Sequence, residues 1–154
     1  MRILVISDVH GRTNALRQAI LEQPAARQVI FLGDGLRDME RVAQEFPERE
    51  FYMVPGNCDF GTSIPASREE TFGGKHFFFT HGHIYKVKYG LYTIDLAARE
   101  RKADIVLFGH THRPHEEYAD GLTLFNPGSL GEGRTYGYVD VTPGGIMTGV
   151  VQLQ

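Results

Sequence analysis

The segment Ile105–His112 reads IVLFGHTH, and the rest of the chain can be interpreted outward from it. Its four leading apolar residues, two of them β-branched, predict a short strand that is buried on both faces. Gly109 ends this strand, and two histidines follow with one residue between them. Because alternate side chains of an extended chain point the same way, we expect His110 and His112 to converge on one side. Neutral imidazole is the commonest side-chain metal ligand, so the pair is a candidate metal site, with two ordinary loop histidines as the alternative.

Length and composition are those of an ordinary globular protein. The 154 residues predict one domain, residues 1–154, with a core of its own. A net charge of −3 argues against a general electrostatic attachment to nucleic acid or to an anionic membrane. Cys58 is the single cysteine, which excludes an internal disulfide framework and fits a reducing compartment. The first apolar run is too short for a signal peptide or a membrane span, so we expect a cytoplasmic location.

The first third of the chain alternates short apolar runs with amphipathic stretches. The predicted order is strand 3–6, helix 14–23, strand 29–32, helix 37–46 and strand 51–54. This alternation indicates a parallel sheet with right-handed crossovers. Each strand is followed by residues that can bind metals, namely Asp8 with His10, then Asp34, then Asn57. Because open α/β sheets bind ligands just outside the carboxyl ends of their strands, we expect a site there.

The rest of the chain changes character and predicts a second sheet. Strands at 68–72 and 75–80 are joined by a Gly-Gly hairpin signal, and a helix is predicted over 89–101 before the strand at 105–108. Four further strands are predicted at 116–119, 122–125, 136–141 and 146–153. We expect the strands after Pro114 to form a second, mostly antiparallel sheet. The predicted architecture is therefore α/β, with two sheets face to face and helices outside.

The donors that follow the strands form one mixed set of carboxylate, amide and imidazole groups. In chain order they are Asp8, His10, Asp34, Asn57, His81, His110 and His112. Such a set suits Mn²⁺, Fe²⁺, Zn²⁺ or Ni²⁺. Seven donors exceed the need of one ion, and a carboxylate shared by two ions about 3.5–4 Å apart would account for them. Taken singly, Asp8 and Asp34 could instead be helix N-caps, and Asn57 could serve a turn.

These residues carry a resemblance to a known family. The blocks Asp8-x-His10, Gly33-Asp34, Gly56-Asn57-Cys58-Asp59, His81 and Gly109-His110-Thr111-His112 resemble, in order and rough spacing, the signature blocks of the calcineurin-like metallophosphoesterases. The short chain and the GNCD block are similar to the small prokaryotic phosphodiesterases of the YfcE type. The resemblance covers nearly the whole chain and implies a four-layer α-β-β-α sandwich of two mixed sheets.

The resemblance also implies a partition of the ligands between two divalent ions. Asp8, His10 and His112 would hold one ion. Asn57, His81 and His110 would hold the other, with Asp34 bridging. Manganese is the ion we expect first. The implied reaction is hydrolysis by a metal-activated water, without a protein nucleophile.

Cys58 departs from the family pattern, in which many members have a histidine that can protonate the leaving oxygen. A thiol is a poor substitute for imidazolium, so His83, two residues beyond His81, is the hypothetical replacement. Cys58 in a chemical role and Cys58 as a small apolar residue are both open.

We expect a phosphodiesterase acting on a small phosphodiester, because every ligand position is filled and the family's longer phosphatase insertions are missing. A phosphomonoesterase, or a non-catalytic interaction scaffold like the retromer subunit of this fold, is the alternative. We expect no nucleic-acid-binding domain, for which these 154 residues have no room.

Other segments have expected roles around the site. Arg12 and Arg134 are the first cations to test for phosphate contact, although both fit ordinary surface arginines. The loop Asn126-Pro127-Gly128-Ser129 is expected to supply turn geometry beside the site, with substrate contact by Asn126 or Ser129 as the alternative. Loops 61–65 and 86–91 are the expected specificity loops. Tyr85, Tyr89 and Tyr92 are a candidate surface for a homo-oligomer, or half-buried core residues.

Overall fold

The computed structural model describes residues 1–154 and contains two five-stranded sheets. The first sheet is built from β1 (Arg2–Ile6), β2 (Gln28–Phe31), β3 (Glu50–Met53), β9 (Thr135–Thr142) and β10 (Gly145–Gln152). The second is built from β4 (Ser67–Phe72), β5 (Lys75–Thr80), β6 (Ile105–Leu107), β7 (His115–Ala119) and β8 (Leu122–Asn126). The strand orders are β10-β9-β1-β2-β3 and β4-β5-β6-β8-β7. The helices are α1 (Thr13–Glu22), α2 (Leu36–Ala43) and α3 (Tyr92–Glu100), with two 3₁₀ turns at His83–Tyr85 and Val87–Tyr89.

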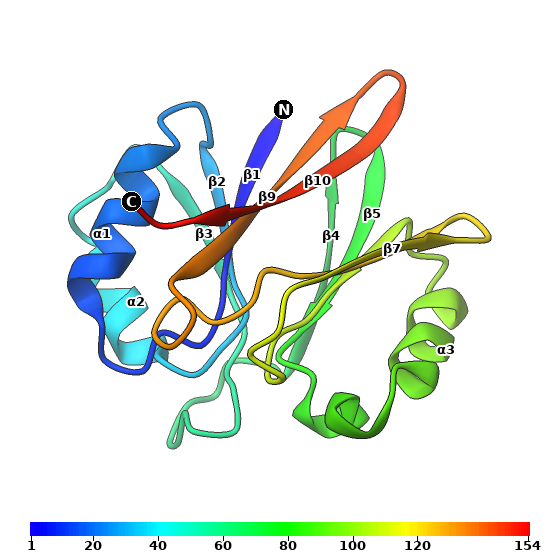
Figure 1. Ribbon diagram of the computed structural model, residues 1–154, viewed down its shortest axis with the longest axis horizontal. Coiled ribbons are helices and arrows are strands. Elements are labelled where there is room, and N and C mark those ends of the chain that lie inside the picture. Colours follow the sequence, from blue (N-terminus) through cyan, green and yellow to red (C-terminus); the bar gives the residue numbers. More distant parts are fainter.

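The layers follow the order helix, sheet, sheet, helix (Figure 1). Helices α1 and α2 cover the outer face of the first sheet, and α3 covers the outer face of the second. This confirms the predicted α-β-β-α architecture. Each α-helix has at most 10 residues, and none is long and apolar enough to span a bilayer.

Strand β1 shows how the sequence builds these layers. Leu4 and Ile6 pack into the cluster beneath α1 and α2, whereas Ile3 and Val5 pack into the cluster between the sheets. Successive side chains of a strand face opposite sides, so a central strand with both faces covered must be apolar throughout. The apolar runs that predicted the strands are therefore the residues that hold the four layers together.

The predicted membership of the sheets is partly wrong. Strands β7 and β8 join the second sheet as expected, but the hairpin of β9 and β10 joins the first sheet, where β9 pairs antiparallel with β1. The second sheet is not mostly antiparallel, because β5, β6 and β8 pair in parallel; it is mixed, as the family resemblance implied. A hairpin signal fixes which two strands pair with each other. The sheet edge that receives the hairpin depends on long-range packing, which local sequence does not encode.

The predicted helix over 89–101 begins later than expected. Gly90 has a φ of 140°, and helix α3 starts only at Tyr92. Of the three tyrosines predicted at a surface patch, Tyr85 packs edge-on against Phe78, whereas Tyr89 and Tyr92 are exposed.

Candidate metal centre

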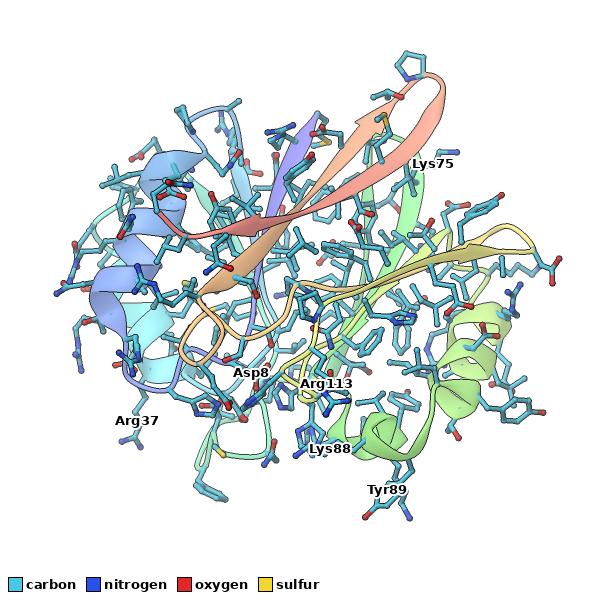
Figure 2. All side chains as sticks on the ribbon, viewed as in Figure 1. Asp8, Arg37, Lys75, Lys88, Tyr89 and Arg113 are labelled. Atoms are coloured by element: carbon cyan, nitrogen blue, oxygen red, sulfur yellow. The ribbon has the colours of Figure 1, made fainter.

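The predicted donors lie at one end of the sandwich, where the carboxyl ends of strands from both sheets meet. Asp8 and Asp34 follow β1 and β2 of the first sheet, and His81 follows β5 of the second. All three side chains are buried, and Figure 2 shows Asp8 at this end of the molecule. His110 and His112 follow β6. The centre is therefore assembled from the two sheets together.

The backbone at the donors is not extended. Asp8, His10, Asp34, His110 and His112 all have left-handed backbones, with φ between 48° and 70°. The extended-chain argument for the His110 and His112 pair was therefore wrong in its geometry. The left-handed turns send the two histidines to different parts of the same centre. Such conformations cost about 1–3 kcal/mol each and concentrate at functional sites.

Asp8, His10 and His112 form the first half of the centre. The Oδ1 atom of Asp8 lies 3.2 Å from Nε2 of His112 and 3.8 Å from Nε2 of His10. The two histidine Nε2 atoms are 3.4 Å apart. The Oδ1 atom of Asp8 is buried and has no hydrogen-bond partner. A buried carboxylate oxygen without a donor is costly, so this geometry favours a cation among the three groups.

Asp34, His81 and His110 form the second half. Nε2 of His81 lies 3.4 Å from Oδ2 of Asp34, 3.7 Å from Oδ1 of Asp8 and 3.2 Å from Nδ1 of His110. Asp8 thus contacts donors of both halves. The side chains of Asp8, Asp34 and His81 can present one atom each to a common ion.

Two histidines are oriented by acceptors on their far sides. The Nδ1 atom of His81 donates to the Leu32 carbonyl oxygen at 2.7 Å, and Nδ1 of His112 contacts the Glu132 carboxylate. When Nδ1 of a neutral imidazole carries the proton and donates a hydrogen bond, Nε2 is unprotonated and can only accept a hydrogen bond or bind a metal ion. The Nε2 atoms of both rings face carboxylate oxygens, which are also acceptors. This acceptor-rich cluster fits divalent metal ions.

Each aspartate uses one oxygen to hold its position and leaves the other for the centre. Oδ2 of Asp8 accepts hydrogen bonds from the Ser7 hydroxyl at 2.6 Å and from the His110 amide at 3.1 Å. Oδ1 of Asp34 accepts from the Cys58 amide at 2.8 Å. The N-cap residues of α1 and α2 are Arg12 and Gly35, so the alternative that these aspartates are N-caps does not hold.

The electrostatics of the centre follow from these contacts. Burial alone would raise the pKa of Asp34, but hydrogen bonding to His81 and the His81 charge hold that pKa well below its usual range. Burial disfavours the charged form of His81, yet its contacts with Asp34 and Asp8 outweigh burial and raise its pKa. Burial, reinforced by the charges of His81 and Lys88, lowers the pKa of His110 to about 4. These contacts favour an ionised Asp34 and a protonated His81, so a metal ion that binds His81 would displace its proton.

The structure brings six of the seven predicted ligands together and leaves Asn57 at the rim. Asn57 is exposed, and its amide nitrogen lies 3.6 Å from Sγ of Cys58. Cys58 is also exposed, so it is not the buried apolar residue that was the alternative. The His83 ring lies 5.4 Å from the His81 ring and 6.1 Å from the His110 ring, measured between centroids. Its Nδ1 atom is buried without a hydrogen-bond partner.

Sequence reasoning missed two acidic residues that position the centre. Glu132 supports His112 from a loop far along the chain. Asp59 accepts hydrogen bonds from four backbone amides, those of Asp34, Gly35, Leu36 and Gly56. The GNCD block could have pointed to Asp59, since Asp often satisfies free amides at the start of a helix.

The loop predicted to shape the site does so by hydrogen bonding. Asn126 donates to the Gly109 carbonyl oxygen and to the Thr111 hydroxyl, at 3.1 and 3.0 Å. Ser129 donates to the Asp8 carbonyl oxygen at 2.8 Å. Both side chains are fully buried, which agrees with turn geometry and not with substrate contact.

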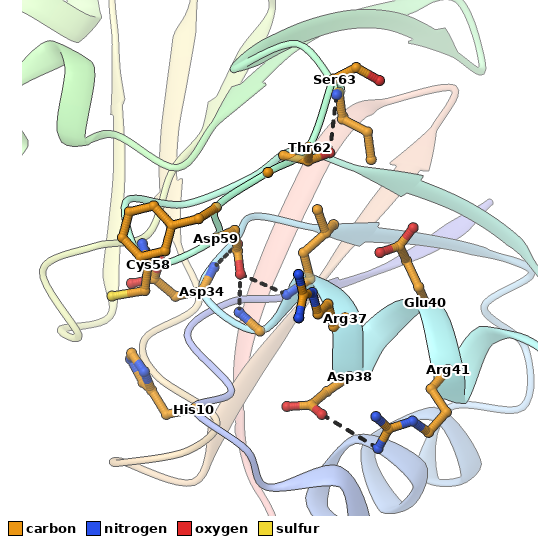
Figure 3. A pocket seen from close by; sticks show the side chains of 15 residues that line it. His10, Asp34, Arg37, Asp38, Glu40, Arg41, Cys58, Asp59, Thr62 and Ser63 are labelled. Carbon is orange, nitrogen blue, oxygen red and sulfur yellow. Dashed lines mark hydrogen bonds and ion pairs between the residues drawn. The ribbon is translucent and has the colours of Figure 1, made fainter.

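Two clefts adjoin the centre, and each expected specificity loop lines one of them. The first, about 750 Å³, lies between α2 and loop 61–65 and includes His10, Asp34 and Cys58 in its wall (Figure 3). The second, about 700 Å³, lies beside loop 86–91 and includes Thr111. The predicted phosphate contacts Arg12 and Arg134 line neither cleft.

Comparisons with known proteins match most of the chain. The family model described as "Calcineurin-like phosphoesterase superfamily domain" matches residues 1–142. The probable metallophosphoesterase YsnB of Bacillus subtilis is 34% identical over 131 residues, covering 84% of this chain and 75% of that protein. The phosphodiesterase YfcE of Escherichia coli K12 is 28% identical over 168 residues, covering 91% of this chain and 88% of that protein.

A solved structure has the same fold. The crystal structure of a predicted phosphoesterase from Streptococcus pneumoniae TIGR4 superposes with a TM-score of 0.79 over 97% of each chain, at 24% sequence identity. This likeness supports the four-layer arrangement of the sheets and helices.

Proposed function

This chain belongs to the calcineurin-like phosphoesterase superfamily, a metal-dependent family of hydrolases, and from this premise we propose that it hydrolyses phosphodiesters with two bound divalent ions. The observation that carries the proposal is the Oδ1 atom of Asp8. It is buried, has no hydrogen-bond donor, and faces imidazole nitrogens of His10, His81 and His112. Because this oxygen lies close to donors of both halves, the two sets are near enough to each other for a pair of ions that share a neighbouring carboxylate.

The assignment of ligands follows the two halves of the centre. Asp8, His10 and His112 would hold one ion. His81 and His110 would hold the other, with Asp34 between the two and Asn57 completing the second set from the rim. Manganese is the ion we propose, with zinc, iron or nickel as substitutes that the same donors accept.

The reaction is the attack of water on the phosphorus atom of a diester. When bound, the ions would lower the pKa of the attacking water and take up charge on the phosphoryl oxygens. A bond forms between the water oxygen and phosphorus, and the bond from phosphorus to the leaving oxygen breaks. The water loses one proton and the leaving oxygen gains one, which gives a phosphomonoester and an alcohol. The protein residues hold the reacting groups in line.

His83 is the residue we propose at the leaving oxygen. It lies beside His81 and His110, and its Nδ1 atom is not engaged by any protein group. Cys58, at the first cleft, would contact the same substrate but is a weaker proton donor. We expect His83→Ala to slow hydrolysis of alkyl diesters, which have basic leaving groups, about 100-fold and aryl diesters much less. Equal rates for wild type and variant on both substrates would remove His83 from the mechanism.

The experiment that tests the proposed function is a paired assay on metal-stripped protein to which Mn²⁺ is returned. One arm uses bis-p-nitrophenyl phosphate and the other p-nitrophenyl phosphate, with Asp34→Ala as the control. Diester hydrolysis that requires Mn²⁺ and is lost in Asp34→Ala supports the proposal. Faster hydrolysis of the monoester would make the protein a phosphomonoesterase. Metal binding without activity on either substrate would indicate a non-catalytic scaffold.

A further inference from the structure

The second cleft, which we call the basic groove, carries a pair of cations beside the metal centre. Its lining includes Lys88, Tyr89, Thr111 and Arg113. Thr111 stands between the candidate ligands His110 and His112 in the sequence. In Figure 2, Asp8 lies between Arg37 on one side and Lys88 and Arg113 on the other. The basic groove therefore lies beside the centre and adjoins it through Thr111.

The two cations have no partner within the protein. The side chains of Lys88 and Arg113 are exposed, and neither makes an ion pair or a side-chain hydrogen bond. No carboxylate lines the groove, and the nearby Glu117 is engaged by His115 at 2.9 Å. A chain of net charge −3 thus presents an uncompensated positive groove next to its centre. Two like charges facing one groove favour an anion between them.

The lining of the first cleft carries charges of both signs, with more acidic residues than arginines. Its wall contains four acidic residues and two arginines, Arg37 and Arg41, of which Arg41 lies 3.9 Å from Asp38. Phe60 is 80% exposed at this cleft and presents an apolar ring. A neutral or aromatic group is therefore favoured in the first cleft, and an anionic group in the basic groove.

We infer that the basic groove binds a second phosphate of the substrate, carried on one arm of the diester that is cleaved. This inference rests on the proposed function and names its substrate class: a phosphodiester with a further phosphate, as in a phosphorylated dinucleotide. Arg113 supplies a planar guanidinium and Lys88 a compact ammonium for the phosphate oxygens. Tyr89, 92% exposed at the groove, presents a ring on which a base can stack.

The test compares matched substrates with and without the extra phosphate. The first pair is 5′-phosphorylated dithymidylate and unphosphorylated dithymidylate. The second pair, which lacks bases, is 3-phosphopropyl and propyl p-nitrophenyl phosphate. Rates are measured on Mn²⁺-loaded protein, and chromatography of the products separates cleavage of the diester from loss of the terminal phosphate. We expect kcat/KM to favour the phosphorylated member about tenfold, and the preference to shrink as salt screens the charges.

Variants assign the preference to the groove. Lys88→Gln with Arg113→Gln replaces both cations with shorter neutral polar side chains, so the ratio of phosphorylated to unphosphorylated rates should fall toward one. Lys75→Gln, a lysine at the far end of β5, is the matched control and should keep the wild-type ratio. Arg37→Gln should keep it as well. Loss of the preference in Arg37→Gln but not in the double variant would overturn the inference in favour of the first cleft.

The outcomes separate this inference from the proposed function. A preference for the phosphorylated substrate in both pairs supports phosphate binding in the basic groove. A preference in the dinucleotide pair alone also supports it, and would indicate that stacking of a base on Tyr89 is needed as well. Hydrolysis of bis-p-nitrophenyl phosphate with no preference in either pair overturns the inference about the basic groove but still supports the proposed phosphodiesterase activity. If no diester is cleaved, calorimetric titration of metal-free protein with thymidine 3′,5′-bisphosphate tests phosphate binding in the basic groove directly. Binding that is about tenfold weaker in the double variant than in wild type supports the inference, and equal binding overturns it.

Discussion

At the scale of single residues, the centre depends on how each donor is held. The two aspartates commit one oxygen to amides or a hydroxyl and keep one for the centre. His81 and His112 are fixed through Nδ1 by a carbonyl oxygen and by Glu132. Groups behind the ligands set the tautomer and orientation of the rings, and so contribute to metal affinity.

We predict that Glu132→Gln weakens Mn²⁺ binding about tenfold. Glutamine lacks the negative charge that keeps Nδ1 of His112 protonated as a donor. We expect a loss of affinity at the low end of the range for residues that support metal ligands, because the Glu132 side chain is 70% exposed. Calorimetric titration of metal-stripped protein measures the affinity. The control is Glu117→Gln, which removes a similar carboxylate from His115 outside the centre. Equal affinities for wild type and Glu132→Gln would contradict the role of Glu132.

Asp140 gives a residue-scale prediction about pH. The Arg2 guanidinium donates to both of its oxygens at 2.8 Å, and this hydrogen bonding lowers the pKa of Asp140. A carboxyl whose pKa is lowered on folding stabilises the protein above its unfolded pKa, near 4, and loses that contribution as the pH falls through the folded pKa.

Asp140→Asn should therefore lower the free energy of unfolding by about 1 kcal/mol at pH 7, a figure reduced for the partial exposure of both partners. The difference from wild type should shrink below pH 4. Urea denaturation at several pH values measures it, with Asp38→Asn, whose contact to Arg41 is 3.9 Å long, as the control. A difference that stays constant between pH 7 and pH 3 would refute this origin.

At the scale of elements, the loops between strands and helices bring the donors together. Gly33 and Gly56, which follow β2 and β3, lie so close that a Cβ on Gly33 would overlap the Gly56 backbone. Asp59 then ties the start of α2 to both loops through its four amide contacts. Its charge also sits favourably at the positive end of the α2 dipole.

We predict that Asp59→Asn destabilises the protein by about 2–3 kcal/mol. The amide side chain keeps one acceptor oxygen, and its NH₂ group faces two backbone N–H groups that lose their acceptor. Because Asp34 is among the affected residues, Mn²⁺ affinity should fall too. Urea denaturation and metal titration measure the two effects. Glu40→Gln, an exposed change on the same helix, should alter neither. Wild-type stability in Asp59→Asn would show that the four contacts contribute little.

At the scale of the whole molecule, the centre exists only where the two sheets pack together. Asp8 and Asp34 come from the first sheet, whereas His81, His110 and His112 come from the second. The spacing between the sheets therefore sets the distances among the donors. Gly137 of β9 lies against the ring of Phe125 of β8, at the interface.

Gly137→Ala tests this spacing, because its methyl group would overlap the Phe125 ring. We expect a loss of about 1–3 kcal/mol in the free energy of unfolding from overpacking, together with weaker Mn²⁺ binding as the sheets shift. Gly144→Ala is the control, since its Cβ meets only the Thr142 hydroxyl at 3.7 Å and its φ is not left-handed. Reduced stability with unchanged Mn²⁺ affinity would show that the centre tolerates a shift between the sheets.

The sequence by itself determined most elements and the candidate donor residues of this protein. Apolar runs located the buried strands, because a strand covered on both faces must be apolar at every position. Polar residues after those runs located the donors at the strand ends, and six of the seven lie together in the structure. The family blocks added the four-layer architecture. These features depend on residues close together in the chain, so local patterns could predict them.

Only the tertiary structure decided how the parts meet. Local sequence could not place the β9 and β10 hairpin in the first sheet, since the edge it joins depends on packing across the molecule. It could not give the left-handed backbones that direct His110 and His112 to different halves of the centre. Nor could it find Glu132 or the pairing of Lys88 with Arg113 in one groove. Each joins residues distant in sequence, and contacts of that kind form only when the chain has folded.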